Sequence, residues 1–287
     1  MSGILSERTE VGRDATLRLR RSPLRWAPGA AAFDRALRSV GQVGLFGVFG
    51  ICGAGIGALV PLYSLLVREP ARRAHGVRGA LHQVLRAYIG SMQAMRLLDL
   101  EVIGFDQAPP PGSLIVANHP SLIDALILLS RVKGGVVVAK RSLAVNPFTW
   151  GSVRGANYVV CDGAPELVDE CRARVAAGEV LVLFPECTRT GADGVMRLRR
   201  GAAQIAVRSG CPVIPVTIDF SEPLLTKRSR WWQAPKVKPN VRVVQHATID
   251  PSEFMQGNHS AARNAPPSAA RAARGLTEHL QALYMKE

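Results

Sequence analysis

An uncharged apolar segment lies near the amino end of the chain, between Arg38 and Arg68. At about 1.5 Å per residue, a helix of this length would cross the hydrocarbon core of a bilayer, which is about 30 Å thick. Seven glycines and Pro61 interrupt the segment, and arginines stand on both sides of it, so both ends are drawn toward the cytoplasm. The pattern predicts a membrane-embedded element over 40–67, with a shallow re-entrant hairpin as its favoured form. The alternative is a buried pair of helices within a soluble domain.

A second helix is predicted over 79–99, where apolar residues recur at helical spacing on one face. That face suits either a membrane interface or a protein core. Together with the apolar segment and the arginine-rich tract before it, this helix defines a basic, membrane-associated helical region over 1–100. No cleavable signal peptide is expected, because the first long apolar run begins only around Val40, behind the arginines.

Beyond Glu101, short apolar runs alternate with helical stretches, which is typical of an α/β domain. We expect residues 101–287 to form such a domain, in which helices flank a central mixed sheet. The apolar runs predict strands at 113–117, 135–140, 157–161, 179–184, 212–219 and 241–247. Helices are predicted at 121–132, 164–177, 200–209 and 269–286.

Charge and composition narrow the class of partner. The 287 residues include 36 Lys and Arg against 22 Asp and Glu, so the formal net charge is +14. An excess of this size favours an anionic partner, such as lipid headgroups, an acidic carrier or nucleic acid. The sequence has no recognised nucleic-acid motif and no basic helix with interleaved aromatics, so nucleic acid is not expected. The hydrophobic fraction of 47% excludes wholesale disorder.

The cysteines indicate the compartment. Five cysteines form no CxxC pair and are odd in number, which argues against a zinc site and against a disulfide framework. Free thiols are typical of a reducing, cytosol-facing location. No metal is expected.

The first candidate for chemistry follows the strand at 113–117, where the chain reads NHPSLID. Domains of the α/β class usually place reactive groups at the carboxyl ends of strands. Pro120 suits a first helical turn, which leaves His119 in the preceding loop and lets its imidazole fold back onto Asp124. Such an imidazole can take a proton from a substrate hydroxyl while the carboxylate fixes its tautomer. The alternative is that Asp124 merely stabilises the helix start.

A second polar turn reads FPECTRTG and again follows a predicted strand. Glu186, Thr188 and Arg189 lie in this turn, and two polar turns at strand ends favour one shared cleft. Arg189 can donate paired hydrogen bonds to a phosphate. Arg199 and Arg200 precede a helix whose amino terminus also attracts an anion. The alternative is a solvated basic turn.

The blocks around these residues resemble the glycerophospholipid acyltransferase superfamily, whose bacterial archetype is the lysophosphatidate acyltransferase. The resemblance covers residues 100–250, and the blocks occur in the same order as in that family. A segment that reads AKRSLAVNPFTWGSVRGANYVV resembles its second block. The other matches are His119 and Asp124 in the HxxxxD block, Phe184–Thr190 in the FPEGTRS block and Val213–Val216 in the fourth block.

The resemblance implies a membrane-associated O-acyltransferase that moves a fatty acyl group from a thioester to the hydroxyl of a lipid acceptor. The acceptor would be of the 1-acylglycerol-3-phosphate type or another lipid, and the donor would be acyl-CoA or acyl carrier protein, with no further cofactor. The resemblance also implies His119 as general base and Asp124 as its orienting partner. The substrate-binding residues would be Lys140, Glu186, Thr188, Arg189, Arg199 and Arg200.

Two departures from the family pattern affect the acceptor. Lysophosphatidate acyltransferases commonly carry a phosphate-binding arginine at the end of the second block, where this chain has Cys161 and Asp162. A carboxylate there would repel a phosphate, so lysophosphatidate is not expected to be the best acceptor. The third block carries Cys187 where glycine is usual, which removes backbone freedom if the turn needs a positive φ.

Other hypotheses stand beside this one. The second block and the later segment PLLTKRSRWWQAP look like acyltransferases of bacterial aryl-polyene and polyketide-lipid pathways. Trp231 and Trp232 suit either a membrane-facing patch or partly buried packing. A non-enzymatic, membrane-attached protein that binds polyanions would also be basic, but the ordered blocks argue against it. The predicted location is the cytoplasmic face of the inner membrane.

Overall fold

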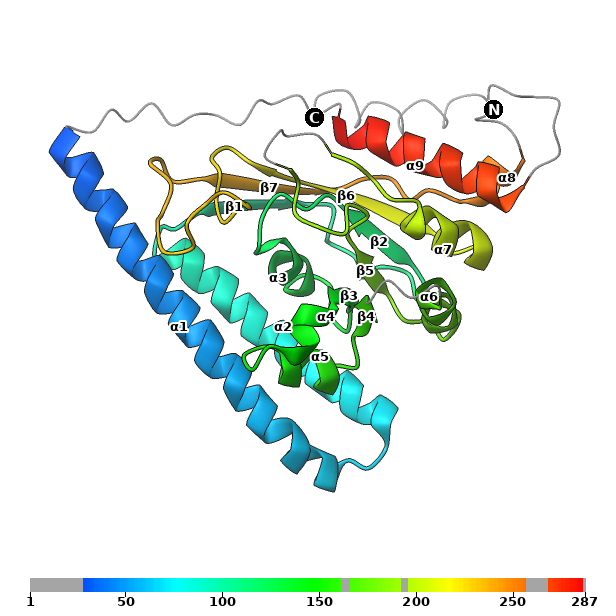
Figure 1. Cartoon of the computed structure of the whole chain (residues 1–287), viewed down its shortest axis with the longest axis horizontal. Coiled ribbons are helices and arrows are strands. Elements are labelled where there is room, and N and C mark those ends of the chain that lie inside the picture. The colour runs from blue at the N-terminus through cyan, green and yellow to red at the C-terminus, as the bar shows by residue number, and fades with distance from the viewer. Residues whose placement is uncertain (1–27, 162–165, 192–195, 257–267, 286–287) are drawn as a thin grey trace, which may run out of the picture.

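The computed structural model describes residues 28–161, 166–191, 196–256 and 268–285. In Figure 1 two long helices lie beside an α/β layer, in which helices cover both faces of the sheet. The helices are α1 (Pro28–Leu66), α2 (Pro70–Ala94), α3 (Asp124–Leu129), α4 (Arg141–Val145), α5 (Trp150–Gly155), α6 (Leu167–Ala176), α7 (Gly201–Ser209), α8 (Ser252–Met255) and α9 (Ala269–Met285). The strands are β1 (Asp99–Ile103), β2 (Leu114–Ala117), β3 (Val136–Lys140), β4 (Val159–Cys161), β5 (Leu181–Leu183), β6 (Val213–Phe220) and β7 (Asn240–Gln245).

The described strands form one mixed sheet in the order β1-β7-β6-β2-β5-β3-β4. Neighbouring strands are parallel except β6 and β7, which run antiparallel. Strands β2 and β5 are buried along their whole length, as expected for parallel strands covered on both faces. The predicted mixed sheet is confirmed, and each of the predicted strands is present.

Side chains of β2 alternate between two cores. Leu114 and Val116 belong to the core beneath α6, α7 and α9, while Ile115 and Ala117 belong to the core beneath α2 and α3. On the first side, the Tyr284 hydroxyl of α9 donates a hydrogen bond to the Val116 carbonyl at 2.7 Å. Because α2 shares a core with the sheet, it holds the helical pair against the α/β layer. The division of the chain at residue 100 stays a prediction.

Some elements differ from the sequence-based expectation. Strand β1 lies at the edge of the sheet and exposes Asp99 and Glu101, so it lacks the apolar run of a buried strand. Helices α4, α5 and α8 have four to six residues, too few for a periodic pattern. The helix expected over 79–99 is α2, which ends at Ala94 because the chain turns at Arg96, where φ is 57°.

The apolar segment forms a single helix, so the predicted re-entrant hairpin over 40–67 is wrong. Helix α1 has 39 residues, which at about 1.5 Å each span about 58 Å. The chain reverses only beyond Leu66, and α2 then runs back beside α1 (Figure 1). None of the glycines breaks the helix, and some of them permit close packing. A Cβ at Gly53 would collide with the Phe148 carbonyl oxygen, so no larger residue fits against the loop before α5.

Helix α1 packs on the protein along one side only. Arg38, Gln42 and Leu45 are buried, and Arg38 donates hydrogen bonds to the carbonyls of Pro235 and Lys236, each at 3.1 Å. From Gly29 to Leu66 the helix is long and apolar enough to cross a membrane. Its other side exposes large apolar side chains: Phe33, Leu37, Val40, Val48, Ile51, Leu59, Leu62 and Leu66.

Candidate active site

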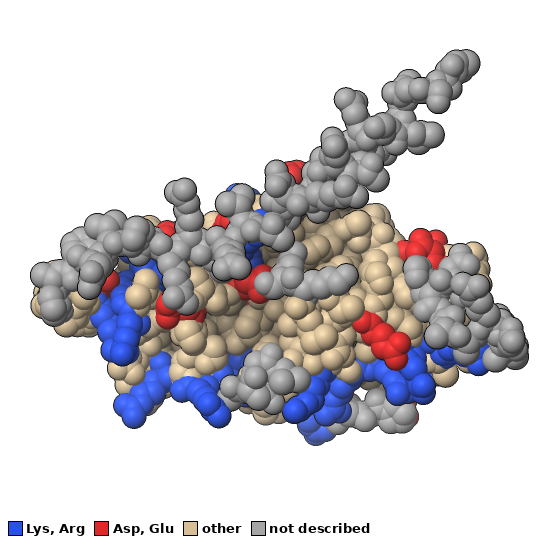
Figure 2. Space-filling model, turned by 90° about the horizontal axis from the view of Figure 1, so that it is seen from above, with Lys and Arg blue, Asp and Glu red and all other residues tan. Residues whose placement is uncertain are grey.

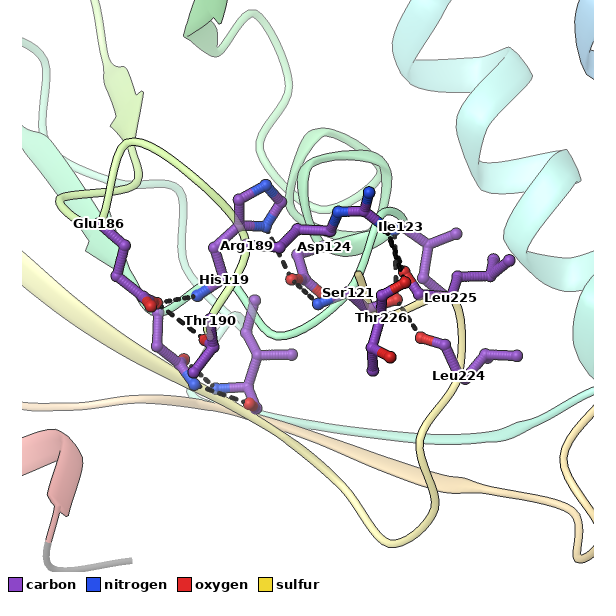
Figure 3. Close-up of polar contacts among 12 residues, drawn as sticks. His119, Ser121, Ile123, Asp124, Glu186, Arg189, Thr190, Leu224, Leu225 and Thr226 are labelled. Carbon is purple, nitrogen blue, oxygen red and sulfur yellow. Dashed lines mark hydrogen bonds and ion pairs between the residues drawn. The ribbon is translucent and has the colours of Figure 1, made fainter. Parts of the chain in front are cut away.

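The loop between β2 and α3 brings His119 onto Asp124, as predicted (Figure 3). The Asp124 Oδ2 atom accepts hydrogen bonds from His119 Nδ1, at 2.9 Å, and from the Ser121 backbone N–H, at 2.7 Å. Since the carboxylate can only accept, Nδ1 carries the proton and Nε2 keeps a lone pair. Nε2 has no partner among the described residues, and 18% of the His119 side chain is exposed. The imidazole is therefore oriented and still able to accept a proton.

Burial shapes the electrostatics of this pair. Asp124 is completely buried, and burial raises the pKa of its carboxyl to about 6, although the hydrogen bond from His119 lowers it. The other oxygen, Oδ1, is buried without a partner among the described residues. A carboxylate held in such surroundings interacts strongly with a positive charge on the imidazole beside it. Asp124 can therefore stabilise the imidazolium that forms when His119 accepts a proton.

Glu186 holds the loop of His119 in place. Its Oε1 atom accepts hydrogen bonds from the His119 backbone N–H, at 2.8 Å, and from the Thr190 hydroxyl, at 3.0 Å. The Thr190 N–H in turn donates to the His119 carbonyl at 2.7 Å. Phe184 stacks on the imidazole, with the ring centroids 4.3 Å apart. Burial raises the pKa of Glu186 above its usual value, while the hydrogen bonds from His119 and Thr190 lower it.

Arg189 joins the same turn to the loop between β6 and β7. Its Nη1 donates to the carbonyls of Leu225, at 2.8 Å, and Thr226, at 3.0 Å. The Leu225 carbonyl also accepts from the Leu122 N–H at 3.1 Å, and Leu225 has a φ of 52°, which is strained for this residue type. One guanidinium nitrogen of Arg189 is thus committed to the protein. Its expected contact with the substrate stays a prediction.

Part of the chain matches a model of a known protein family. The model described as Acyltransferase matches residues 99–219, which include both site loops. Residues 99–219 belong to the acyltransferase family. The more specific resemblance to aryl-polyene acyltransferases stays a prediction.

Curated relatives of this acyltransferase domain carry the name 1-acyl-sn-glycerol-3-phosphate acyltransferase. A Caenorhabditis elegans protein with that name is 31% identical over 140 residues, which are 46% of this chain and 50% of that protein. The alpha form from Homo sapiens is 26% identical over 161 residues, 52% of this chain and 55% of the relative. The chain spans about half the length of the curated relatives it matches.

A solved structure shows the same fold. The 1-acyl-sn-glycerophosphate acyltransferase of Thermotoga maritima superposes with a TM-score of 0.62 at 22% identity. The match covers 88% of this chain and 97% of that one, so the likeness includes more than the acyltransferase domain. At this identity the likeness shows the fold alone.

Two cations flank the candidate site at the end of the sheet. Lys140 ends β3 and pairs in register with Cys161 of β4. The Arg199 backbone N–H donates to the Pro185 carbonyl at 2.8 Å, which brings Arg199 beside the turn of Glu186. Both positive charges lower the pKa of Cys187, although burial raises it by more. Lys140 and Arg199 therefore lie close to the same turn.

The structure bears differently on the other residues that the sequence singled out. Thr188 lies in the turn and Arg200 precedes α7, but no described hydrogen bond or ion pair connects either side chain to the site. Cys187 has a φ of 55°, so the turn does need the positive φ that glycine adopts easily. Asp162 lies outside the described residues. The predicted repulsion of phosphate by Asp162 stays a prediction.

The sequence did not point to several residues that contribute to the candidate site. The Ser121 hydroxyl donates to the Leu224 carbonyl at 2.7 Å, and Thr190 binds Glu186 as described above. Lys227 is close enough for its charge to lower the pKa of Glu186. A serine after a proline suits a helix start and gives no hint of a partner about a hundred positions away. The chain-distant contacts of these residues become visible only in the folded structure.

Proposed function

We propose that this protein is a membrane-associated O-acyltransferase that moves a fatty acyl group from a thioester to the hydroxyl of a lysophospholipid. The observation that carries the proposal is the arrangement of His119, whose Nδ1 is bound to buried Asp124 while Nε2 faces no protein partner among the described residues. An imidazole held in this way serves as a general base. The family of residues 99–219 and the names of the curated relatives support the same reaction.

The proposed reaction needs one base and no covalent intermediate on the protein. His119 Nε2 takes the proton of the acceptor hydroxyl as its oxygen attacks the thioester carbonyl carbon. The new C–O bond gives a tetrahedral intermediate, whose collapse breaks the C–S bond. The leaving thiolate takes the proton back from Nε2, so the base is restored. Asp124 stabilises the imidazolium between the two steps, and Glu186 holds the backbone of His119 in place through a hydrogen bond.

The acceptor would carry a negatively charged headgroup. Lys140 and Arg199 lie near the turn that holds Glu186, and charge-assisted hydrogen bonds from such side chains suit a phosphate. Lys140 pairs in register with Cys161, near the end of the block where the family resemblance implies a phosphate-binding cation. Lysophosphatidate is therefore tested against uncharged acceptors and against other anionic lysophospholipids, because Asp162 predicts that it is not the best of them. The donor would be acyl-CoA or acyl carrier protein, and both are acidic.

A basic surface would help to attract these acidic partners. The formal net charge is +14, and Figure 2 shows Lys and Arg side chains gathered along one long edge of the face seen there. Such an excess of one sign raises the local concentration of an anionic partner. Steering of this kind depends on ionic strength, because the Debye length is about 8 Å in physiological salt.

Helix α1 would attach the protein to the membrane by lying along its surface. At about 58 Å the helix is almost twice as long as the hydrocarbon core is thick, about 30 Å. One side packs on the α/β layer while the other exposes apolar side chains, which is the pattern of an interfacial helix. The free cysteines favour the cytoplasmic face.

The test combines each acyl donor with each acceptor and measures acyl transfer. Purified full-length protein is mixed with acyl-CoA or acyl carrier protein, each labelled in the acyl chain, and with lysophosphatidate, other lysophospholipids, glycerol 3-phosphate or a hydroxylated polyketide. The proposal predicts label in an ester of a lysophospholipid. Binding of the acidic donors without any acyl transfer would overturn it and favour a protein that only binds polyanions.

A further inference from the structure

An apolar groove lies between the two long helices, apart from the site described above. Its volume is about 500 Å³, within the range of about 300–1,000 Å³ that is usual for small-molecule sites. Leu59, Leu62 and Leu66 of α1 form one wall, and Val77 and Ala80 of α2 form the other. Every lining residue comes from these two helices. The groove therefore belongs to the hairpin and not to the loops that carry His119 and Glu186.

The groove opens on the apolar side of α1. Leu59, Leu62 and Leu66 line it and are also among the exposed side chains of that helix. When this side of α1 lies in a bilayer, the mouth of the groove faces hydrocarbon. Nearly all of the lining is apolar, and Tyr63 supplies a hydroxyl next to Gly76. These surroundings suit an acyl chain and exclude a polar ligand.

Cations gather at the end of the groove where the hairpin turns. Arg68, Arg72 and Arg73 stand here against a single carboxylate, that of Glu69. Arg72 and Arg73 lie one helical turn before Gly76 and Val77, so they lie on the face of α2 that forms the groove.

The start of α2 adds to this positive charge. The helix begins at Pro70 with no acidic residue in its first turn, and no side chain caps its free N–H groups. Unpaired N–H groups at a helix start attract anions. An anionic group at the mouth of the groove would therefore meet arginines and a helix amino terminus together.

We propose that the groove binds one phospholipid of the surrounding bilayer, with an acyl chain between α1 and α2 and an anionic headgroup at Arg68 and Arg72. An acyl chain that enters the groove leaves one hydrocarbon environment for another, so burial alone gives no preference. The charges at the turn select an anionic lipid over a zwitterionic one. The inference rests on the membrane attachment in the proposed function and is independent of acyl transfer.

The experiment labels the bound lipid in place. Full-length protein is bound to vesicles that contain trace phosphatidylglycerol or phosphatidylcholine, each with a photoactivatable group at the end of one acyl chain. After irradiation, labelled peptides are identified by mass spectrometry. We expect the phosphatidylglycerol probe to label residues 59–66 and 76–81 at least threefold more than the phosphatidylcholine probe. The combined change of Arg68, Arg72 and Arg73 to Gln is expected to remove this difference.

A matched pair of variants tests the groove itself. Ala80→Trp fills the groove, whereas Ala58→Trp adds the same side chain to an exposed position of α1 outside it. Ala80→Trp is expected to reduce labelling of the groove peptides at least fivefold, and Ala58→Trp to leave it unchanged. Equal labelling by both probes, or labelling spread evenly along α1, would overturn the inference.

Flotation of the vesicles separates this inference from the proposed function. If the protein floats with the vesicles but the groove is not labelled, the groove inference fails and the attachment stands. If the protein does not float, the membrane part of the proposed function fails together with the inference. Acyl transfer measured in detergent tests the catalytic part apart from both. Arg68 and Arg72 are exposed and Arg73 is half-buried, so changing Arg68 and Arg72 alone to Gln keeps the test valid even if Ala80→Trp or the triple variant does not fold.

Discussion

Two apolar regions of the molecule differ in what covers them. Strand β2 is completely buried, with 0% exposure at Leu114 and Val116, between helices on both faces. Helix α1 is also largely apolar, but Ile51 is 74% and Leu66 84% exposed. Apolar residues therefore serve two purposes: β2 stabilises the fold and carries His119 beyond its end, whereas the outer side of α1 stays exposed and, in the proposed function, contacts a membrane. Substitutions in one region should therefore leave the function of the other intact.

Apart from the loss of His119 itself, the largest effect is expected at the carboxylate beside it. Asp124→Asn keeps an acceptor for the imidazole but removes the negative charge that stabilises the imidazolium. We expect kcat to fall by about 100-fold to 1,000-fold, within the range for impaired acid–base catalysis. Binding to vesicles is expected to stay normal, because α1 is unchanged. A loss of less than tenfold in kcat would contradict the assigned role.

Asp124→Asn is expected to raise the stability of the protein although it lowers kcat. Burial raises the pKa of Asp124 to about 6, so ionisation of this group lowers the stability of the fold. The stability that the protonated carboxyl contributes is present below about pH 4 and is lost as the pH rises through 6. Asparagine does not ionise, so Asp124→Asn is expected to gain about 1–3 kcal/mol in unfolding free energy at pH 8. Denaturant unfolding at pH 4 and pH 8 measures the difference. A gain in unfolding free energy over wild type that is no larger at pH 8 than at pH 4 would refute this account.

Changes on the outer side of α1 should affect membrane binding and leave catalysis intact. Val40, Ile51 and Leu59 are exposed, and each would bury an apolar side chain worth about 1.5–3 kcal/mol in the bilayer. Changing all three to Asp is expected to weaken vesicle binding at least tenfold, while kcat in detergent stays within twofold. Met285→Asp, at an exposed apolar position of α9, is the matched control. Full vesicle binding by the triple variant would place the attachment elsewhere.

The next prediction concerns the cation at the end of β3. Lys140→Gln removes one charge-assisted contact, worth about 1.5–3 kcal/mol, so KM for lysophosphatidate is expected to rise about tenfold or more. KM for an uncharged monoacylglycerol should not change, and Lys133→Gln, at another exposed lysine, serves as control. An unchanged KM in Lys140→Gln together with a large gain from Cys161→Arg would show that β4 and not β3 forms the phosphate site.

The smallest effect is expected at the strained turn. Cys187 has a φ of 55°, which costs a non-glycine residue about 1–2 kcal/mol. Cys187→Gly is expected to raise the unfolding free energy by about 1 kcal/mol, because the relieved strain exceeds the entropy cost of glycine. Thermal unfolding measures this change. Cys52→Gly, at an exposed position in α1, should be destabilising, since glycine weakens a helix.

The contrast between the two regions also explains what could be predicted from the sequence. Buried strands are continuous apolar runs, so β2 and β5 were predictable, whereas edge strand β1 with Asp99 and Glu101 was not. The glycines of α1 indicated a bend, but a glycine that faces a close neighbour and one that breaks a helix look the same in a sequence. Gly53 is of the first kind, because Phe148 packs against it.

The candidate site shows the same limit. The pair of His119 and Asp124 was predictable because only five positions of chain separate them. The expected place of Pro120 in the first helical turn is wrong, since α3 begins at Asp124 and leaves Pro120 in the loop. The contact of Glu186 with the His119 backbone spans 67 positions, and no local pattern specifies it. The contacts of Arg189 with the Leu225 and Thr226 carbonyls span 36 and 37 positions. Such contacts depend on the order of strands in the sheet.

The central claim is that His119 acts as the base in acyl transfer. The most direct measurement is the rate at which labelled acyl groups pass from the best donor to the best acceptor in wild type, His119→Ala and His75→Ala. His75 is an exposed histidine of α2 and serves as the matched control. We predict a loss of at least about 1,000-fold in His119→Ala, wild-type rates in His75→Ala, and unchanged circular dichroism in both. Acyl transfer by His119→Ala at close to the wild-type rate would contradict the account.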